Sequence, residues 1–317
     1  MLRLNDFDVV TPETVDEVIA ALAEPGAMIV AGGTDLVPKL KRGQFEPSVL
    51  VSLSRLRGLD TITESSGRVT IGALTTLRAV ERSDALAPFT AVREAVRQVA
   101  TPIIRNNATL GGNLAQDTRC RYYDRGKFWR EAVGYCLKKD GDECRVAPGG
   151  GRCFATFCSD IAPALAVHGA RVTVTGIARR TLPLESIYRD DGIEYIDLER
   201  EMITSVEIDN RGLTSTYKKL RIRDGFDFPE VGVAAAIGGD GPLKLKAAVT
   251  GVGPRICVLE EETDEVGEVD EARVDDFVER VFKAVRPVDT MFFSPAYRKK
   301  MVRRLLRQAF NELLAAR

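Results

Sequence analysis

The hydrophobic pattern near the start of the chain predicts an amphipathic helix over residues 11–23. Thr11 is a candidate N-cap, and Pro12 takes the first helical position, where a missing N–H is tolerated. One face of this helix would carry four apolar residues at helical spacing, Val15, Val18, Ile19 and Leu22. Residues 24–26 (Glu-Pro-Gly) predict the end of the helix, and residues 27–31 predict a short buried strand.

The remaining chain alternates between strand-like and helix-like patterns. Apolar or alternating stretches predict strands at residues 48–53, 68–72, 171–175, 201–208, 230–237 and 243–250. Helical spacing predicts helices at residues 75–82, 89–99 and 295–316. We interpret the acidic stretch 260–271 as a solvated loop or helix face. These elements predict an α+β fold with largely antiparallel sheets.

The charge balance excludes some partners. The 317 residues contain 45 Lys and Arg against 46 Asp and Glu, so a formal net charge of −1 gives no indication of nucleic acid or an anionic membrane. The chain shows neither the pattern of a secretory leader nor an apolar run near the roughly 20 residues that cross a bilayer. We therefore expect a cytoplasmic protein.

Two glycine pairs suggest contacts to phosphate. Gly32 and Gly33 follow the strand at 27–31 directly, and glycine lets backbone N–H groups approach an anion without a Cβ in the way. Thr34 and Asp35 add a hydroxyl and a carboxylate for a phosphate or a ribose. Residues 109–113 (Thr-Leu-Gly-Gly-Asn) repeat this chemistry. If both turns face one cleft, they would hold a dinucleotide from opposite sides; a purely structural role for either turn remains open.

Cysteines dominate the segment between residues 120 and 158. Four of them, at 120, 136, 144 and 153, read better as metal ligands than as disulfides in a cytosolic protein. Their spacing contains no Cys-x-x-Cys pair, so zinc and an iron–sulfur cluster both stay open. Aromatic residues of the same segment would form an apolar shell for a cluster, a small core of their own, or both at once: Tyr122, Tyr123, Phe128, Trp129 and Tyr135.

Two further features bear on function. From residue 119 to 145 there are eight basic and five acidic residues, which suits an acidic electron donor or an ordinary solvated surface. The only histidine, His168, lies in an apolar stretch and is expected in the core. With one histidine we assemble no catalytic triad, and a cofactor would carry the redox chemistry.

Five stretches in order make the whole chain similar to one family. Residues 29–36, 104–114 and 159–163 resemble the three signatures of the FAD-binding medium subunits of molybdenum hydroxylases, the xanthine dehydrogenase and CO dehydrogenase group. Residues 217–224 with Asp227 resemble the start of that family's C-terminal domain, and residues 294–298 the start of its last helix. The resemblance implies a two-subdomain FAD-binding fold, a small βαβ part plus a mixed or antiparallel sheet, followed by an α+β C-terminal domain. The expected bounds are 1–55, 56–211 and 212–317.

The resemblance also implies which residues bind FAD. The backbone around Val30 to Asp35 would hold the pyrophosphate, Thr109, Gly112, Asn113 and Asp160 the ribityl chain and phosphates, and Lys219 the isoalloxazine or a phosphate. The full expected set is Ile29, Val30, Ala31, Gly32, Gly33, Thr34, Asp35, Leu36, Thr101, Thr109, Gly112, Asn113, Gln116, Asp160, Lys219 and Asp227.

The cysteine segment, expected as an insert at about residues 116–157, resembles that of the 4-hydroxybenzoyl-CoA reductase β subunits, where it binds one [4Fe-4S] cluster. Cys120, Cys136, Cys144 and Cys153 fall on the ligand positions. We expect Cys158 and Cys257 to be ordinary buried thiols, with Cys158 as the candidate to replace Cys153 if one ligand were misassigned. The implied function is electron transfer, with no catalytic residue on this chain, in a molybdenum enzyme that removes the hydroxyl of 4-hydroxybenzoyl-CoA.

The same resemblance implies the partners. They are a molybdopterin-binding large subunit, a small subunit with two [2Fe-2S] clusters and ferredoxin as donor, assembled as a dimer of heterotrimers. Two alternatives stay open: the FAD subunit of another molybdenum hydroxylase that oxidises an aromatic or heterocyclic substrate, and a non-redox scaffold whose cysteines bind zinc.

Overall fold

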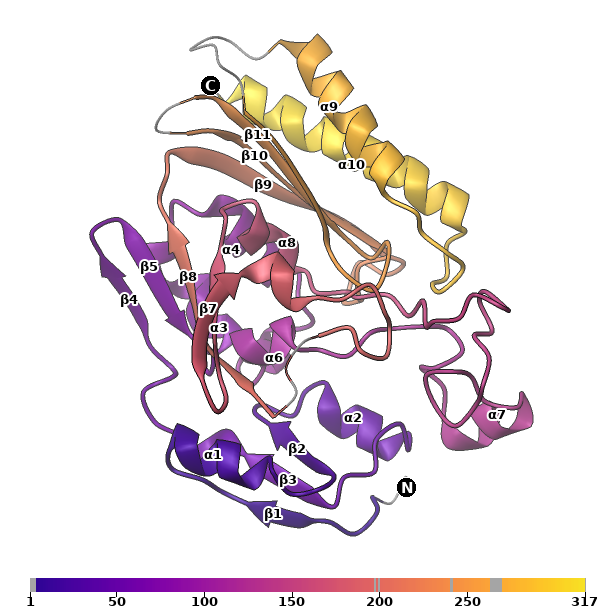
Figure 1. The fold of residues 1–317 in the computed structure, drawn as a ribbon. Coiled ribbons are helices and arrows are strands. Elements are labelled where there is room, and N and C mark those ends of the chain that lie inside the picture. Colours follow the sequence, from indigo (N-terminus) through magenta and orange to yellow (C-terminus); the bar gives the residue numbers. More distant parts are fainter. Residues whose placement is uncertain (1–3, 197, 199, 240–241, 263–269, 317) are drawn as a thin grey trace.

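The computed structural model describes residues 4–196, 198, 200–239, 242–262 and 270–316, and it contains three sheets stacked along the molecule (Figure 1). The first sheet is small and parallel, in the order β1-β3-β2. Its elements run β1 (Asp8–Val10), α1 (Val15–Ala21), β2 (Ala27–Val30), α2 (Leu36–Lys41) and β3 (Val49–Ser52), followed by a 3₁₀ turn at Leu53–Arg55. Strands joined through a helix give the βαβ unit that the sequence predicted.

The first helix is shorter than its pattern predicted. It begins at Val15, and its N-cap is Thr14, whose side chain accepts a hydrogen bond from the N–H of Glu17 at 3.3 Å. The expected N-cap Thr11 and the expected first helical residue Pro12 both lie outside the helix. The prediction was wrong because Thr14 offers the same capping chemistry nearer the apolar face.

The second sheet is antiparallel, in the order β4-β5-β8-β6-β7. Its strands are β4 (Ile62–Ser65), β5 (Arg68–Gly72), β6 (Arg171–Thr175), β7 (Arg179–Pro183) and β8 (Met202–Asp209). The helices beside it are α3 (Leu77–Arg82), α4 (Thr90–Arg97), α5 (Pro102–Arg105), α6 (Leu110–Leu114) and α8 (Ile161–Ala166), with 3₁₀ turns at Asp84–Leu86 and Leu184–Ile187. Residues of this sheet and these helices share one large core.

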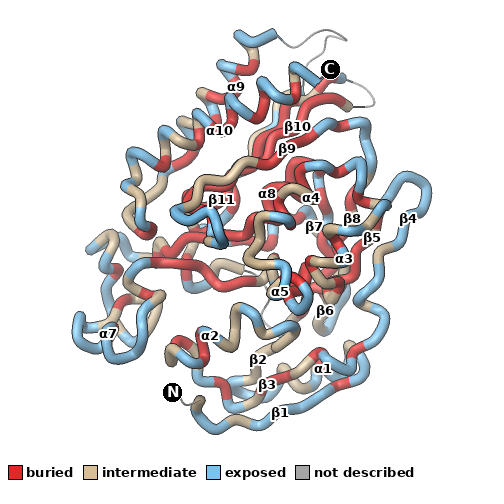
Figure 2. The backbone as a smooth tube through the Cα atoms, turned by 180° about the vertical axis from the view of Figure 1, so that it is seen from behind, coloured by how far each residue is buried: buried red, intermediate tan, exposed pale blue. Residues whose placement is uncertain are grey.

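The third sheet is antiparallel, in the order β12-β11-β10-β9, and two long helices lie on its outer face (Figure 1). Its elements are β9 (Leu213–Leu220), β10 (Val231–Gly238), β11 (Lys244–Thr250), β12 (Cys257–Glu262), α9 (Glu271–Ala284) and α10 (Pro295–Ala315). All of β10 is buried because both its faces are covered (Figure 2). Successive side chains of β10 point to opposite faces of the sheet. Val233 and Ala235 pack in one core with α9 and α10, and Ala234 and Ala236 pack in another core with α4 and α8.

The acidic stretch 260–271 was only partly interpreted correctly. Glu260, Glu261 and Glu262 lie on strand β12, where Lys244 and Lys246 of β11 form ion pairs with Glu260 at 3.6 and 2.9 Å. Residues 263–269 lie outside the described residues, and Glu271 begins α9. β12 is an edge strand, where charged side chains are common, so the sequence of residues 260–262 alone did not distinguish a strand from a solvated helix face.

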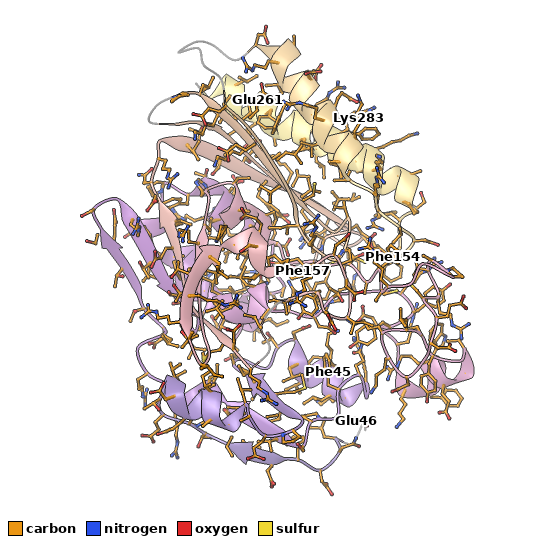
Figure 3. The ribbon with its side chains drawn as sticks, viewed as in Figure 1. Phe45, Glu46, Phe154, Phe157, Glu261 and Lys283 are labelled. Carbon is orange, nitrogen blue, oxygen red and sulfur yellow. The ribbon has the colours of Figure 1, made fainter. Side chains whose placement is uncertain are left out.

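The segment 116–157, expected from the sequence to be an insert, extends to the side of the molecule, where α7 (Lys127–Ala132) lies level with α2 and apart from the sheets (Figure 1). Its end enters the body at Phe157, which Figure 3 labels near the centre of the molecule. The Phe157 ring is fully buried, with its centroid 4.5 Å from that of Tyr188, and its carbonyl accepts hydrogen bonds from Thr250 Oγ1 and from the N–H of Gly251. The α+β fold predicted from the sequence is confirmed, while the exact domain bounds stay a prediction.

Candidate functional site: a flavin cradle and a cysteine hollow

The first two glycine signatures touch through their backbones. The chain leaves β2 at Val30 and turns at Gly33, whose φ of 69° suits glycine. At Gly32 a Cβ would lie 1.8 Å from the carbonyl oxygen of Asn107, so any side chain there would separate the turn from the segment before Thr109. Glycine at this position is therefore required by close approach, and the predicted neighbourhood of the two turns is real.

The second signature forms a short helix, which the sequence did not predict. Thr109 is the N-cap of α6, and its Oγ1 accepts a hydrogen bond from the N–H of Gly112 at 3.1 Å. Asn113 Oδ1 accepts a hydrogen bond from Ser159 Oγ at 2.6 Å, and Ser159 Oγ itself accepts one from the N–H of Ala162. These bonds connect the second signature to the third, although 46 residues separate Asn113 from Ser159.

The third signature meets the C-terminal sheet through a buried ion pair. The Asp160 carboxylate accepts hydrogen bonds from Tyr217 Oη at 2.7 Å and from Lys219 Nζ, with the shortest Lys219 contact at 2.9 Å. Lys219 Nζ also donates to the Asp227 carbonyl at 2.7 Å and the Gln98 carbonyl at 3.1 Å. Burial raises the pKa of Asp160, while Lys219 and Tyr217 act in the opposite direction.

The expected flavin residues thus form a nearly continuous set of contacts from Gly32 to Asp227. Ile29 and Val30 lie on β2, Ala31 and Thr34 in the turn, and Leu36 at the start of α2. Among the described hydrogen bonds, Thr101 and Gln116 take no part in this set. Thr101 Oγ1 caps α5 by accepting from the N–H of Ile104, and Gln116 is buried at the beginning of the insert.

Asp35 has a partner that the sequence did not indicate. Its carboxylate forms an ion pair with Arg119 of the insert and accepts a long hydrogen bond of 3.4 Å from the N–H of Asp117. The Arg119 guanidinium also lies over the ring of Phe228, 4.0 Å from its centroid. The carboxylate expected to face a ribose therefore holds the insert against the glycine turn.

The four cysteines expected as ligands line one small hollow. Cys120, Cys136, Cys144 and Cys153 are each at most 8% exposed. Among the residues the structure describes, no three His, Cys, Asp or Glu side chains converge on a point suited to one metal ion. The thiols surround a space instead. Cys158 is also buried but does not line the hollow, and its Sγ donates to the Thr156 carbonyl, so it does not replace Cys153 there.

Burial makes two of these thiols, Cys120 and Cys153, weaker acids than usual. It raises the pKa of Cys120 to about 12 and that of Cys153 to about 11. Neighbouring thiols add to both effects, since Cys153 and Cys136 raise the pKa of Cys120, and Cys144 raises that of Cys153. The backbone N–H of Ala155 lies 3.4 Å from Cys153 Sγ, a contact that favours the thiolate. A bound metal would have to displace these protons.

The aromatic shell is smaller than predicted. Tyr122 and Tyr123 line the hollow. Phe128 and Trp129 lie on α7 and are 85% and 38% exposed, so they do not enclose it. The physical reason is that α7 packs through Arg130, which is 1% exposed and donates to the carbonyls of Arg42 and Gly43.

Buried charges form the wall between the hollow and α2. Asp117 accepts from Lys39 Nζ at 2.8 Å and from Lys138 Nζ at 2.6 Å. Both ammonium groups lie 4.7 Å from the centre of the Tyr123 ring. Burial opposes the charge of Asp117, yet Lys138 and Lys39 bring its pKa down to about 2. Burial also lowers the pKa of Lys39. Sequence reasoning missed this group because Lys39 lies 78 residues from Asp117 and carries no motif.

Comparison with known proteins identifies the family. A family model described as the FAD binding domain in molybdopterin dehydrogenase matches residues 5–210. The chain belongs to this family. The aldehyde oxidoreductase FAD-binding subunit PaoB of Escherichia coli (strain K12) is 34% identical over 246 residues, which cover 70% of this chain and 74% of that subunit. The 6-hydroxypseudooxynicotine dehydrogenase complex subunit alpha of Paenarthrobacter nicotinovorans is 38% identical over 117 residues, 36% of this chain and 40% of that one.

Solved structures share the fold of this FAD-binding subunit over its whole length. Quinoline 2-oxidoreductase from Pseudomonas putida 86 superposes with a TM-score of 0.75 at 21% identity, and CO dehydrogenase from Oligotropha carboxidovorans with 0.76 at 24%. Each match covers 99% of both chains, so it includes the third sheet, which lies beyond residue 210. The chain is an FAD-binding subunit of the molybdenum hydroxylase type. No described helix is long and apolar enough to span a membrane.

Proposed function

We propose that this FAD-binding subunit also holds one [4Fe-4S] cluster and transfers electrons in a molybdenum enzyme that reductively dehydroxylates 4-hydroxybenzoyl-CoA to benzoyl-CoA. The observation that carries the proposal is the shared hollow of Cys120, Cys136, Cys144 and Cys153. Four thiolates around a space suit a cluster of several atoms, whereas zinc draws its four ligands to one point. Tyr122 and Tyr123 would limit the access of solvent to the cluster. The backbone N–H of Ala155 would donate to the sulfur of Cys153.

The flavin would occupy the cradle of the three signatures. FAD supplies exchange of one or two electrons when it is bound. The turn at Gly32 and Gly33 presents backbone N–H groups for the pyrophosphate, and Thr109 keeps its O–H free to donate while its oxygen caps α6. Lys219 and Asp160 hold each other at the edge of the C-terminal sheet. We propose Gly112, Asn113 and Asp160 as contacts to the ribityl chain and phosphates, and Thr101, Gln116 and Asp227 as further contacts to the same group.

The assembly is also a proposal. We infer a molybdopterin-binding large subunit that carries the substrate pocket, a small subunit with two [2Fe-2S] clusters, ferredoxin as donor, and a dimer of heterotrimers. CO dehydrogenase medium chains among the relatives support a subunit of a larger complex. We keep three domains, 1–55, 56–211 and 212–317, with the insert at about 116–157, because each would contain one of the three sheets.

Anaerobic purification of the complex tests the cluster. We expect about eight iron atoms per heterotrimer, four more than two [2Fe-2S] clusters contain, and a spin-half signal in low-temperature EPR after reduction with dithionite that is additional to those of the [2Fe-2S] clusters. Cys136→Ser should remove the additional signal and the additional iron, and Cys158→Ser, the matched control, should keep both. Stoichiometric zinc without the additional iron would instead support the scaffold alternative. Flavin bound to the same sample would then show that only the cluster had been assigned wrongly.

A second candidate is an FAD subunit of an enzyme that oxidises an aromatic or heterocyclic substrate. The alignment with the aldehyde oxidoreductase subunit favours it. Two assays on the purified complex separate the candidates. Formation of benzoyl-CoA with a reduced low-potential dye supports our proposal. Reduction of an artificial acceptor by aldehydes or N-heterocycles, without benzoyl-CoA formation, supports the alternative.

A further inference from the structure

Lys39 and Lys138 share Asp117 but differ in their relation to the cysteine hollow. Lys138 lines the hollow, two residues after Cys136, whereas Lys39 comes from α2. The side chain of Lys138 is 6% exposed, that of Lys39 is 1% exposed and that of Asp117 is 8% exposed. Each lysine therefore places a charge in a region that water does not screen.

The position of Lys138 is fixed by more than the ion pair. Its Nζ also donates to Thr118 Oγ1 and to the carbonyl of Gly192, both at 2.5 Å. Gly192 in turn donates its backbone N–H to the carbonyl of Cys153 at 2.9 Å. At Gly192 a Cβ would lie 2.7 Å from Cys153 Sγ, so the glycine that accepts from Lys138 lies beside one of the four thiols. The ammonium is thus held at the wall of the hollow by three oxygen acceptors.

A charge at this wall acts on reduction. A cluster with four thiolate ligands becomes more negative when it accepts an electron, so a nearby cation favours the reduced form and a nearby anion the oxidised form. The geometry gives Lys138 the cationic role and Asp117, behind it, the opposing one. Lys39 binds the other carboxylate oxygen of Asp117 and does not line the hollow, so it should act more weakly because Coulomb energy falls with distance.

We propose that Lys138 and Asp117 set the reduction potential of the cluster in opposite directions, as positioning charges that bind neither iron nor substrate. The inference rests on the proposed function, since it requires the cluster to be present. It assigns a purpose to buried charges that neither flavin binding nor metal ligation uses.

Redox titration followed by EPR, on the anaerobically purified complex, measures the potential directly. Lys138→Met should lower the reduction potential of the cluster. At a fixed solution potential, the ratio of reduced to oxidised cluster should fall at least about tenfold, which corresponds to a shift of 59 mV for one electron. Lys138→Arg keeps the charge and should stay near the wild type. Lys39→Met, the matched control, should shift the potential less than Lys138→Met. Asp117→Asn should shift it upward.

Iron content is measured for each variant to separate loss of the cluster from a change in its potential. Equal shifts in Lys39→Met and Lys138→Met, or no shift in Lys138→Met with iron retained, would overturn the inference. If Lys138→Met loses its iron, Asp117→Asn decides, because an upward shift supports the inference and an unchanged or lower potential contradicts it. A wild-type complex without iron beyond that of the two [2Fe-2S] clusters would instead overturn the proposed cluster itself.

Discussion

The flavin cradle and the cysteine insert are held together by different kinds of contact. In the cradle, backbones approach directly at Gly32, and neutral side chains such as Asn113 and Ser159 share hydrogen bonds above a large apolar core, with one buried ion pair, Asp160–Lys219, where the cradle meets the C-terminal sheet. In the insert, charged side chains provide most of the described long-range contacts. Arg119, Lys138 and Arg130 are buried and bind carboxylates or carbonyls, and the apolar cluster around the thiols is small.

This difference has a physical consequence. A region that rests on an apolar core loses stability gradually with each contact removed, because burial is spread over many side chains. A region that rests on buried charges responds strongly to single changes, because one removed partner leaves the other charged and unsolvated. Flavin content and iron content therefore report on the two regions separately.

Gly32→Ala should have the largest effect on the cradle. Its Cβ would lie 1.8 Å from the Asn107 carbonyl oxygen, so the first two signatures must separate, at a cost of at least about 3 kcal/mol in unfolding free energy. We expect the flavin content of the purified complex to fall more than tenfold while iron is retained. Gly225→Ala is the matched control, since its Cβ would meet nothing within 4 Å. Loss of iron together with flavin would show that the two regions fold as one.

Arg130→Met should act on the insert instead. The guanidinium donates to the carbonyls of Arg42, Gly43 and Arg125, and these charge-assisted bonds together contribute about 3 to 4 kcal/mol. Hydrogen exchange should become faster in residues 121–135, and iron content should fall while flavin stays bound.

Lys127→Met on the same helix is the control for Arg130→Met. Lys127 is 61% exposed and lies 3.6 Å from Glu46, so its removal should change stability by less than about 1 kcal/mol. Faster exchange in the cradle in place of the insert would contradict the comparison.

The sequence predicted these two regions unequally well. Periodicity found β5 and β6 with their bounds and α10 within a residue, because long patterns that face a core are strong signals. It missed α6 and β12, since Gly-Gly-Asn does not look helical and a glutamate-rich edge strand does not look buried. The motif residues came together as expected, from Gly32 to Asp160. Arg119, Lys39 and Lys138 could not be predicted, because a buried charge is explained only by its partner, and the partner lies far along the chain.

Mild acid should destabilise the large core around His168 before it destabilises the insert. His168 is buried, with its ring T-shaped to that of Phe89 and its Nε2 2.9 Å from Ser215 Oγ, and burial lowers its pKa to about 4. Above pH 6.5 the imidazole is neutral in both the folded and the unfolded state. Between pH 6.5 and 4 only the unfolded state takes up the proton, so stability falls as pH falls, by roughly 3 kcal/mol in all. The insert lacks histidine, and Asp117 stays ionised in this range.

Urea unfolding of the metal-free chain at pH 7, 5.5 and 4 measures this effect. The wild type should lose stability across the series, and His168→Asn, which can still bond to Ser215, should show a flatter dependence. An equally steep dependence in His168→Asn would show that other groups dominate. A midpoint followed by Trp129 fluorescence, which reports on the insert, should change less than one followed by far-UV circular dichroism.

The smallest expected effect distinguishes a capping role from a binding role within the cradle. Thr76 and Thr109 face each other across an isolated bridge, and each caps a helix by accepting a backbone hydrogen bond, at 3.2 Å from Ala79 and 3.1 Å from Gly112. Replacing either by alanine should lower stability by about 1 kcal/mol. Only Thr109→Ala should also weaken flavin binding, by roughly fivefold, because its O–H would be lost as a donor to the cofactor. Flavin titration of the two variants at matched temperature below their unfolding transitions measures the difference. Equal flavin affinity in Thr76→Ala and Thr109→Ala would show that Thr109 acts only as a helix cap. The pyrophosphate would then be bound by the backbone of the glycine turns alone.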